Sequence, residues 1–281
     1  MPELPEVETI RLQLEKYLVG KTILGVQIKL PKIFIGDPQK LIGQKIIGTR
    51  RFAKVIVLDL SNNYSILTHL KMTGQYIYRD QKVSGELSKK VFGGVPGIHS
   101  HVILRLSGGA MLYYNDVRRF GWLKVVPTDK VEEENFVKKL GPEFLKNLTL
   151  EKFREILSKN KTAIKVLLMD QEKVSGVGNI YANDALWLAE VDPKRPAKSL
   201  SGSEQKELFE SVEKVLKTSL AYQGSSEDAY VTPEGKEGSY QLHSLVYRKD
   251  GQLCSRCKKA KIVRITQGGR GTFYCPICQK G

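Results

Sequence analysis

The sequence lacks any long apolar run, and this absence excludes a membrane-spanning helix. Its longest aliphatic runs, such as Val55–Leu58, are far shorter than the roughly 18 residues that such a helix needs. The first twenty residues contain four glutamates and no apolar segment, so we also expect no secretory signal peptide. Together the two absences predict a cytoplasmic protein.

The chain has fewer acidic residues than basic residues. The 281 residues include 45 Lys and Arg against 30 Asp and Glu, which gives a net charge of +15. Such an excess indicates a polyanionic partner, either nucleic acid or an anionic membrane surface, and the lack of apolar segments disfavours the membrane. The composition, 41% hydrophobic and 27% charged, is that of a folded protein long enough for two domains.

Cysteine is absent from the first nine-tenths of the chain. A disulfide framework would spread cysteines through the fold, and two matched C-x2-C pairs argue against a single redox dithiol. Four thiolates at this spacing can fill a tetrahedral coordination shell and leave no open position for catalysis. We therefore predict one structural Zn²⁺. Its ligands are Cys254, Cys257, Cys275 and Cys278.

The segment around these cysteines is strongly basic. Residues 244–281 contain nine Lys and Arg against a single acid, Asp250. A solvated lysine face is the ordinary interpretation of such a cluster. On a module this small, however, the charge favours contact with phosphate groups.

The periodicity of apolar residues divides the chain. Residues 5–19 have the spacing of an amphipathic helix, and residues 22–126 alternate with a period of two, which is typical of a β-sandwich or barrel. A polar, acidic stretch over 127–134 is a candidate linker. Residues 135–222 are helical in pattern, and residues 223–243 have no periodicity, as expected of a long functional loop.

The N-terminus, Met-Pro-Glu-Leu-Pro-Glu, has a chemical interpretation. Initiator methionine is normally removed before a small residue, which would leave Pro2 with a free secondary amine. Such an amine can attack an aldehyde-level carbon and form an iminium, and Glu3 beside it could act as a general acid. The alternative is structural, because Pro2 and Pro5 would also stiffen the entry to a helix.

These features together resemble bacterial formamidopyrimidine-DNA glycosylases, which excise 8-oxoguanine and ring-opened purines. The resemblance covers essentially the whole chain, in the order of the family's motifs. The matching segments are residues 1–9, 69–74, 116–121, 176–182 and 269–279, in addition to the four cysteines.

The resemblance implies an α+β fold of two domains. It has an N-terminal β-sandwich with an N-terminal helix, and a helical helix–two-turns–helix domain that ends in a β-hairpin zinc finger. The expected boundaries are 1–127 for the catalytic domain, 135–223 for the helical domain, 224–243 for a lesion-capping loop and 244–281 for the zinc finger.

The resemblance also implies a mechanism. Pro2 would attack the anomeric carbon of the damaged nucleotide, Glu3 would protonate the ring oxygen, and Lys54 would contact phosphate and assist elimination. β- and δ-elimination would then cut the strand on both sides of the lesion, so the enzyme would be a bifunctional glycosylase and AP lyase.

The implied partner is damaged double-stranded DNA, bound by a monomer at the nucleoid. Met72, Arg118 and Phe120 match the residues that fill the void left by the everted nucleotide. The residues that match the family's grip on the flanking phosphates are Lys165, Asn179 and Arg270.

One segment departs from the family pattern. Glu227–Tyr230 is more acidic than the usual capping loop, which leaves open the preference among 8-oxoguanine, ring-opened purines and oxidised pyrimidines. An endonuclease VIII-like enzyme for oxidised pyrimidines is the nearest alternative, although that branch resembles Met-Pro-Glu-Gly-Pro, and residue 4 here is leucine. The other alternative is a non-catalytic zinc-ribbon protein that only binds DNA.

Overall fold

The computed structural model describes residues 1–281, which group into two compact units. The first unit comprises residues 1–138 and 220–241, and the second comprises residues 139–219 and 242–281. None of the helices combines the length and the apolar character that spanning a bilayer would require.

The chain begins with helix α1 (Leu4–Leu18), close to the expected range. Pro5 lies in its first turn, and a capping box closes its N-terminus, because the Glu6 carboxylate accepts the Glu3 backbone N–H at 2.7 Å. The apolar stripe that includes Val7, Ile10 and Leu14 is fully buried, so this helix is fixed by packing as well as by its cap.

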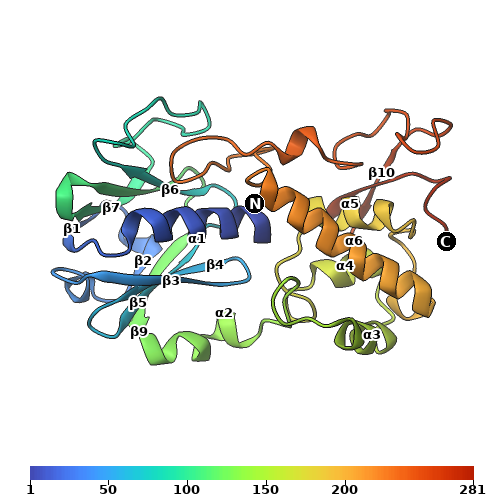
Figure 1. Cartoon of the computed structure of the whole chain (residues 1–281), viewed down its shortest axis with the longest axis horizontal. Helices are drawn as coiled ribbons and strands as arrows, with labels where there is room; N and C mark the ends of the chain where they lie inside the picture. Colours follow the sequence, from blue (N-terminus) through green and yellow to red (C-terminus); the bar gives the residue numbers. More distant parts are fainter. The chain divides into compact units, whose positions relative to one another are not determined.

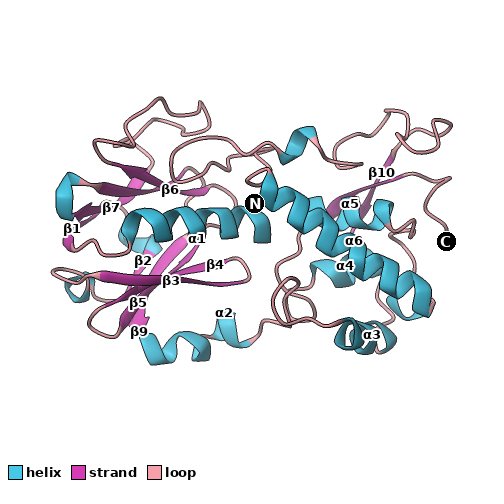
Figure 2. Cartoon of the chain, viewed as in Figure 1, coloured by secondary structure: helices cyan, strands magenta, loops and turns pink.

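Two sheets form the N-terminal unit, and α1 runs alongside them (Figures 1 and 2). The four-stranded sheet has the order β1-β7-β8-β6, and the five-stranded sheet has the order β2-β9-β5-β4-β3. All neighbours are antiparallel except β2 and β9. The strands are β1 (Ile23–Ile28), β2 (Phe34–Ile35), β3 (Ile46–Phe52), β4 (Val55–Leu60), β5 (Tyr64–His69), β6 (Gly74–Arg79), β7 (Ser100–Leu106), β8 (Met111–Asp116) and β9 (Trp122–Pro127).

The main core lies between these sheets and α1. Leu14 of α1, Ile56 of β4, Leu104 of β7 and Tyr76 of β6 belong to one cluster of buried side chains. The expected β-sandwich is therefore confirmed.

The stretch over 127–134 differs from the expected linker. It forms short 3₁₀ turns that lead into α2 (Asn135–Lys138), and Val131 is completely buried in an apolar cluster with Val55 and Leu67. Val131, the Thr128 N–H donated to the Asn63 carbonyl at 2.8 Å and the Lys124–Glu134 ion pair attach this stretch to the N-terminal unit.

The expected long loop is present, and it is firmly attached to the N-terminal unit. Residues 222–239 contain no helix or strand. Tyr78 donates its backbone N–H to Pro233 and Ser88 donates its own to Gly235, both at 2.8 Å, and Val231 is 1% exposed. An aperiodic sequence here has a defined structure that depends on partners far away in the chain.

The second unit contains most of the helical segments and a β-hairpin. Helix α5 is the element around which the hairpin and the cysteine-containing loops pack. Its buried Asn183 accepts the Phe273 backbone N–H at 2.7 Å, and its buried Asp184 accepts three backbone N–H groups of residues 245–247 at 2.9–3.1 Å. The elements are α3 (Leu150–Ser158), α4 (Ile164–Met169), α5 (Asn179–Leu188), α6 (Gly202–Ala221), β10 (Val263–Gln267) and β11 (Arg270–Tyr274).

Candidate active site and DNA interface

The two predicted catalytic residues at the N-terminus are both buried. Glu3 is 3% exposed, and Pro2 is also buried, whereas Met1 is partly exposed and its amino group lies 3.8 Å from the Asp228 carboxylate. In the full-length chain the Pro2 nitrogen is an amide. Removal of Met1 would convert it into the secondary amine that the predicted chemistry needs.

Glu6 connects this N-terminus to the loop over residues 222–239. One of its carboxylate oxygens accepts the Glu3 N–H, and the other accepts the Ser225 N–H at 2.8 Å. Gly224 has φ +83°, and a Cβ there would lie 2.9 Å from the Glu6 side chain, so only glycine fits. A buried carboxylate with two backbone donors holds the loop beside the predicted catalytic residues.

The loop over residues 222–239 is also attached to the C-terminal end of α1. The Tyr17 hydroxyl donates to the Glu234 carboxylate, and the Tyr17 ring stacks on Tyr78 with centroids 4.8 Å apart. Burial, together with this carboxylate, raises the pKa of Tyr17 to about 12. The phenol therefore keeps its proton, and the hydrogen bond persists at neutral pH.

Lys54 lies in the turn between β3 and β4, directly after Ala53, whose φ is +49°. It is only 5% exposed, so it is not an ordinary exposed strand lysine. Burial and the nearby charges of Lys71 and Lys54 lower the pKa of His69 to about 3. His69 is therefore neutral, and its Nδ1 accepts the Lys71 N–H at 3.0 Å.

Asp116 links the two turns that carry the predicted void-filling residues. Its buried carboxylate accepts the Thr73 hydroxyl and, at 2.8 Å, the Gly121 N–H. Thr73 in turn accepts the Arg118 N–H at 2.9 Å. The turn that contains Met72 and the turn that contains Phe120 are thus parts of one hydrogen-bonded structure.

Steric fit around Tyr114 also fixes these turns. A Cβ would lie 2.7 Å from the Tyr114 hydroxyl at Gly74 and 1.8 Å from it at Gly121, so both positions require glycine. Lys71 and Arg119, one in each turn, adopt left-handed φ values of +51° and +59°. Such strain in non-glycine residues is typical of turns whose conformation has a function.

The void-filling candidates project from these turns. Phe120 is 58% exposed, and the Arg118 guanidinium, also exposed, lies 5.0 Å from the Phe120 ring centre. Met72 is half-buried. An exposed phenylalanine is not core packing, and it is the geometry of an apolar insert.

In the second unit, Lys165 is fully buried, which differs from the exposed cation expected of a phosphate contact. Its ammonium donates to Asn179 and Thr272, both at 2.7 Å, and to the Gly271 carbonyl at 3.1 Å. Arg270 is exposed at the start of β11. The structure therefore brings all three phosphate candidates to one place, where Lys165 joins Asn179 to the hairpin that carries Arg270.

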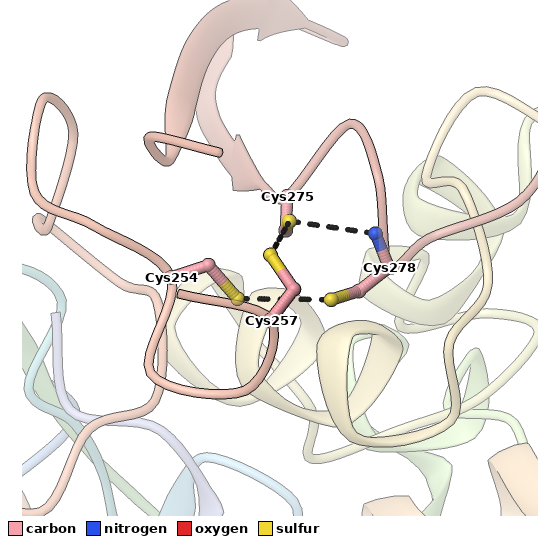
Figure 3. A group of neighbouring side chains, drawn as sticks. All are labelled: Cys254, Cys257, Cys275 and Cys278. Atoms are coloured by element: carbon pink, nitrogen blue, oxygen red, sulfur yellow. Dashed lines mark hydrogen bonds between the residues drawn. The ribbon is translucent and has the colours of Figure 1, made fainter. Parts of the chain in front are cut away.

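The four cysteines converge on one point, as Figure 3 shows. All are free thiols, with Sγ–Sγ distances of 3.7 Å for Cys254–Cys278 and 3.8 Å for Cys257–Cys275. Zinc–sulfur bonds of about 2.3 Å in a tetrahedron place sulfurs about 3.8 Å apart, so this cradle fits zinc. The cysteines hold one structural zinc.

Several supporting residues gave little signal in the sequence. Glu6, Asn183 and Asp184 are buried, and each accepts a backbone N–H from a distant segment. Buried Asp116 accepts the nearby Gly121 N–H and the distant Thr73 hydroxyl. The two α5 residues stand among apolar residues of a helix, and polar groups in that position must find partners. This pattern indicates a structural role for the two side chains, but it does not predict which segment they bind.

Comparisons with known proteins cover the whole chain. Three family models match it: the formamidopyrimidine-DNA glycosylase N-terminal domain over residues 1–123, the H2TH domain of the same glycosylase over 140–230, and the zinc finger found in FPG and IleRS over 251–281. The chain belongs to the formamidopyrimidine-DNA glycosylase family. It is therefore a DNA glycosylase with AP lyase activity, and the expected fold class and zinc finger are confirmed.

Relatives of the same length carry this name. The formamidopyrimidine-DNA glycosylases of Streptococcus mutans and Listeria monocytogenes are each 39% identical to the chain, with complete coverage of both sequences. A crystal structure of Lactococcus lactis Fpg with N7-benzyl-Fapy-dG-containing DNA superposes with a TM-score of 0.87 at 33% identity over both whole chains. Another structure of that protein, with DNA that contains an oxidised pyrimidine, gives 0.86 at 34% identity.

Proposed function

We propose that the mature chain, with Pro2 at its N-terminus, excises oxidised purines from duplex DNA and cleaves the resulting abasic site. The substrate class is supported by the Lactococcus relative, whose structures include complexes with Fapy-dG-containing and abasic-site-containing DNA. The observation that carries the assignment to Pro2 is the Glu3–Glu6–Ser225 connection, which places the loop over residues 222–239 beside the N-terminus.

The chemistry starts with the Pro2 amine. Its lone pair attacks C1′ of the damaged nucleotide, the glycosidic bond breaks, and the base leaves. Glu3 protonates the ring oxygen as the C1′–O4′ bond opens, which gives an iminium between Pro2 and C1′. The iminium acidifies the neighbouring C–H bonds, and loss of protons from C2′ and then C4′ expels the 3′ and 5′ phosphates. Lys54 assists at these phosphates.

The duplex is held by both units. Met72 and Phe120 wedge into the stack after the nucleotide is everted, and Arg118 hydrogen-bonds the orphaned partner base. Asn179 and Arg270 contact flanking phosphates. Lys165 acts through them, since its ammonium already has three acceptors in the folded protein. The enzyme works as a monomer on nucleoid DNA in the cytoplasm.

We extend the proposal to a lesion range broader than 8-oxoguanine alone, on the evidence of the Lactococcus relative. Glu227 and Asp228 stand where the family usually carries threonine and a basic residue, and Lactococcus Fpg has been crystallised with an oxidised pyrimidine in DNA. Excision from duplexes that each carry one defined lesion opposite C or A measures this range. Excision restricted to 8-oxoguanine would contradict the broader range.

The assignment is tested by substituting Glu3. Glu3→Gln keeps the size of the side chain and removes the acid, so excision should fall about 10²- to 10⁴-fold while duplex binding is retained. The matched control is Glu15→Gln on the exposed face of α1, which should excise at the rate of the unchanged protein. Pro2→Gly should also abolish excision. Loss of binding in step with loss of excision would contradict the catalytic roles.

A further inference from the structure

A groove lies next to the wedge residues, and apart from Phe120 its lining residues have no part in the mechanism above. It lies within the N-terminal unit and has a volume of 460 Å³, within the range of small-molecule sites. It is lined by Lys32 and Ile33 of the 3₁₀ turn before β2 and by Ile35 of β2, together with the start of α2 at Phe136 and most of residues 119–124.

Three aromatic side chains line the groove. Phe120 is 58% exposed, and the rings of Trp122 and Phe136 meet nearly at right angles, 80°, with centroids 6.1 Å apart. The neutral His69 packs edge-on against Phe136 at 4.9 Å and supports this arrangement from the buried side. Exposed and half-exposed rings on a rigid base are the kind of surface on which unstacked nucleobases bind.

The charge of the groove is positive. Lys32 and Arg119 are exposed and form no ion pair or side-chain hydrogen bond with another residue of the chain. A third cation, Lys124, is bound to Glu134 at 2.6 Å. Two uncompensated cations beside three aromatic rings match the two halves of a nucleotide, its base and its phosphate.

We propose that this groove takes one unstacked nucleotide of the DNA next to the position of the Phe120 wedge. The base stacks on Trp122 and meets Phe136 edge-on, since the two rings lie nearly at right angles, and its phosphate contacts Lys32 and Arg119. The inference rests on the proposed function, because Phe120 both lines the groove and forms the wedge. A wedge unstacks the step it enters, and the groove supplies a new stacking surface for the nucleotide that the wedge displaces.

Photochemical cross-linking tests this placement on the full, zinc-loaded protein. 5-Iodouracil is placed in turn at each position within three nucleotides of an abasic-site analogue, on both strands, and irradiated while bound. We expect one position, neither the lesion nor its partner, to cross-link to Trp122 or Phe136, as identified by peptide mass. Absence of any cross-link to these residues would overturn the proposal.

Two charge reversals serve as a matched pair. Lys32→Glu should lower the yield at that position about tenfold, which corresponds to about 1.4 kcal/mol. Lys45→Glu changes the net charge equally at an exposed site outside the groove and should leave the yield unchanged. Equal loss in both variants would attribute the effect to overall charge and contradict the groove.

Borohydride trapping at the N-terminus separates this proposal from the proposed function. It is measured on the same protein variants with a true abasic site in place of the analogue, because its aldehyde carbon forms the iminium that borohydride reduces. Normal trapping without a groove cross-link overturns the groove alone, whereas loss of trapping overturns the catalytic assignment.

Discussion

The two units hold their predicted DNA-facing residues by different means. In the N-terminal unit, close steric fit and one buried carboxylate fix the turns around Met72 and Phe120. In the second unit, a zinc site and the polar groups of α5 fix the hairpin that carries Arg270. The difference follows from size, because a sandwich core can support strained turns whereas a small hairpin module needs a metal.

Removal of zinc should give the largest effect and should stay within the second unit. Structural zinc contributes about 10–16 kcal/mol to folding in zinc-finger peptides, so chelation should unfold residues 254–278 and greatly weaken DNA binding. Hydrogen exchange of the backbone amides measures the unfolding separately in each unit. We expect the amides of β3–β9 to keep their protection, and equal loss of protection in the sandwich would contradict the separation of the two supports.

Asp184→Ala should be the next most damaging change. It removes a buried acceptor of three backbone N–H groups, so the free energy of unfolding should fall by about 3 kcal/mol. Denaturation of the zinc-loaded protein measures the loss, and Glu210→Ala on the exposed face of α6 is the control. An unchanged stability would mean that the zinc alone holds residues 245–247.

Gly121→Ala tests the steric support in the N-terminal unit. The new Cβ would overlap the Tyr114 hydroxyl, so we expect a loss of about 1–3 kcal/mol in stability and reduced excision. The hydroxyl itself has no hydrogen-bond partner, so Tyr114→Phe alone should be nearly neutral. The double variant should recover part of the loss, because it removes the closest obstacle and leaves the His69 carbonyl at 3.0 Å and the Asp116 carboxylate at 3.1 Å. Failure of this rescue would show that the hydroxyl is not the obstacle.

His69 gives the smallest predicted effect. Burial, with the nearby lysine charges, lowers the pKa of His69 from 6.5 to about 3. Between these two pH values His69 is protonated in the unfolded chain and neutral in the folded protein. Stability should therefore fall by about 1.4 kcal/mol per pH unit below 6.5, and it is fully present above that pH. His69→Asn keeps an acceptor for the Lys71 N–H and should remove this slope, measured as Tm between pH 7.5 and 5.5. An unchanged slope would assign the acid sensitivity to other groups.

The sequence predicted those parts of the molecule that depend on local pattern. The cysteine spacing, the helix at the N-terminus and the alternating strands each carry their own signal, and the structure contains all of them. The attachment of residues 222–239 could not be predicted, because it depends on pairings such as Glu6 with Ser225, more than 200 residues apart. The burial of Lys165 was missed for the same reason, since its partners at Gly271 and Thr272 come from the distant hairpin.

The central claim is that the Pro2 amine is the nucleophile, and peptide mapping of the borohydride-trapped complex tests it most directly. We predict that the DNA adduct lies on an N-terminal peptide that begins with Pro2 and lacks Met1. An adduct on a lysine side chain, or full activity in protein that retains Met1, would contradict it.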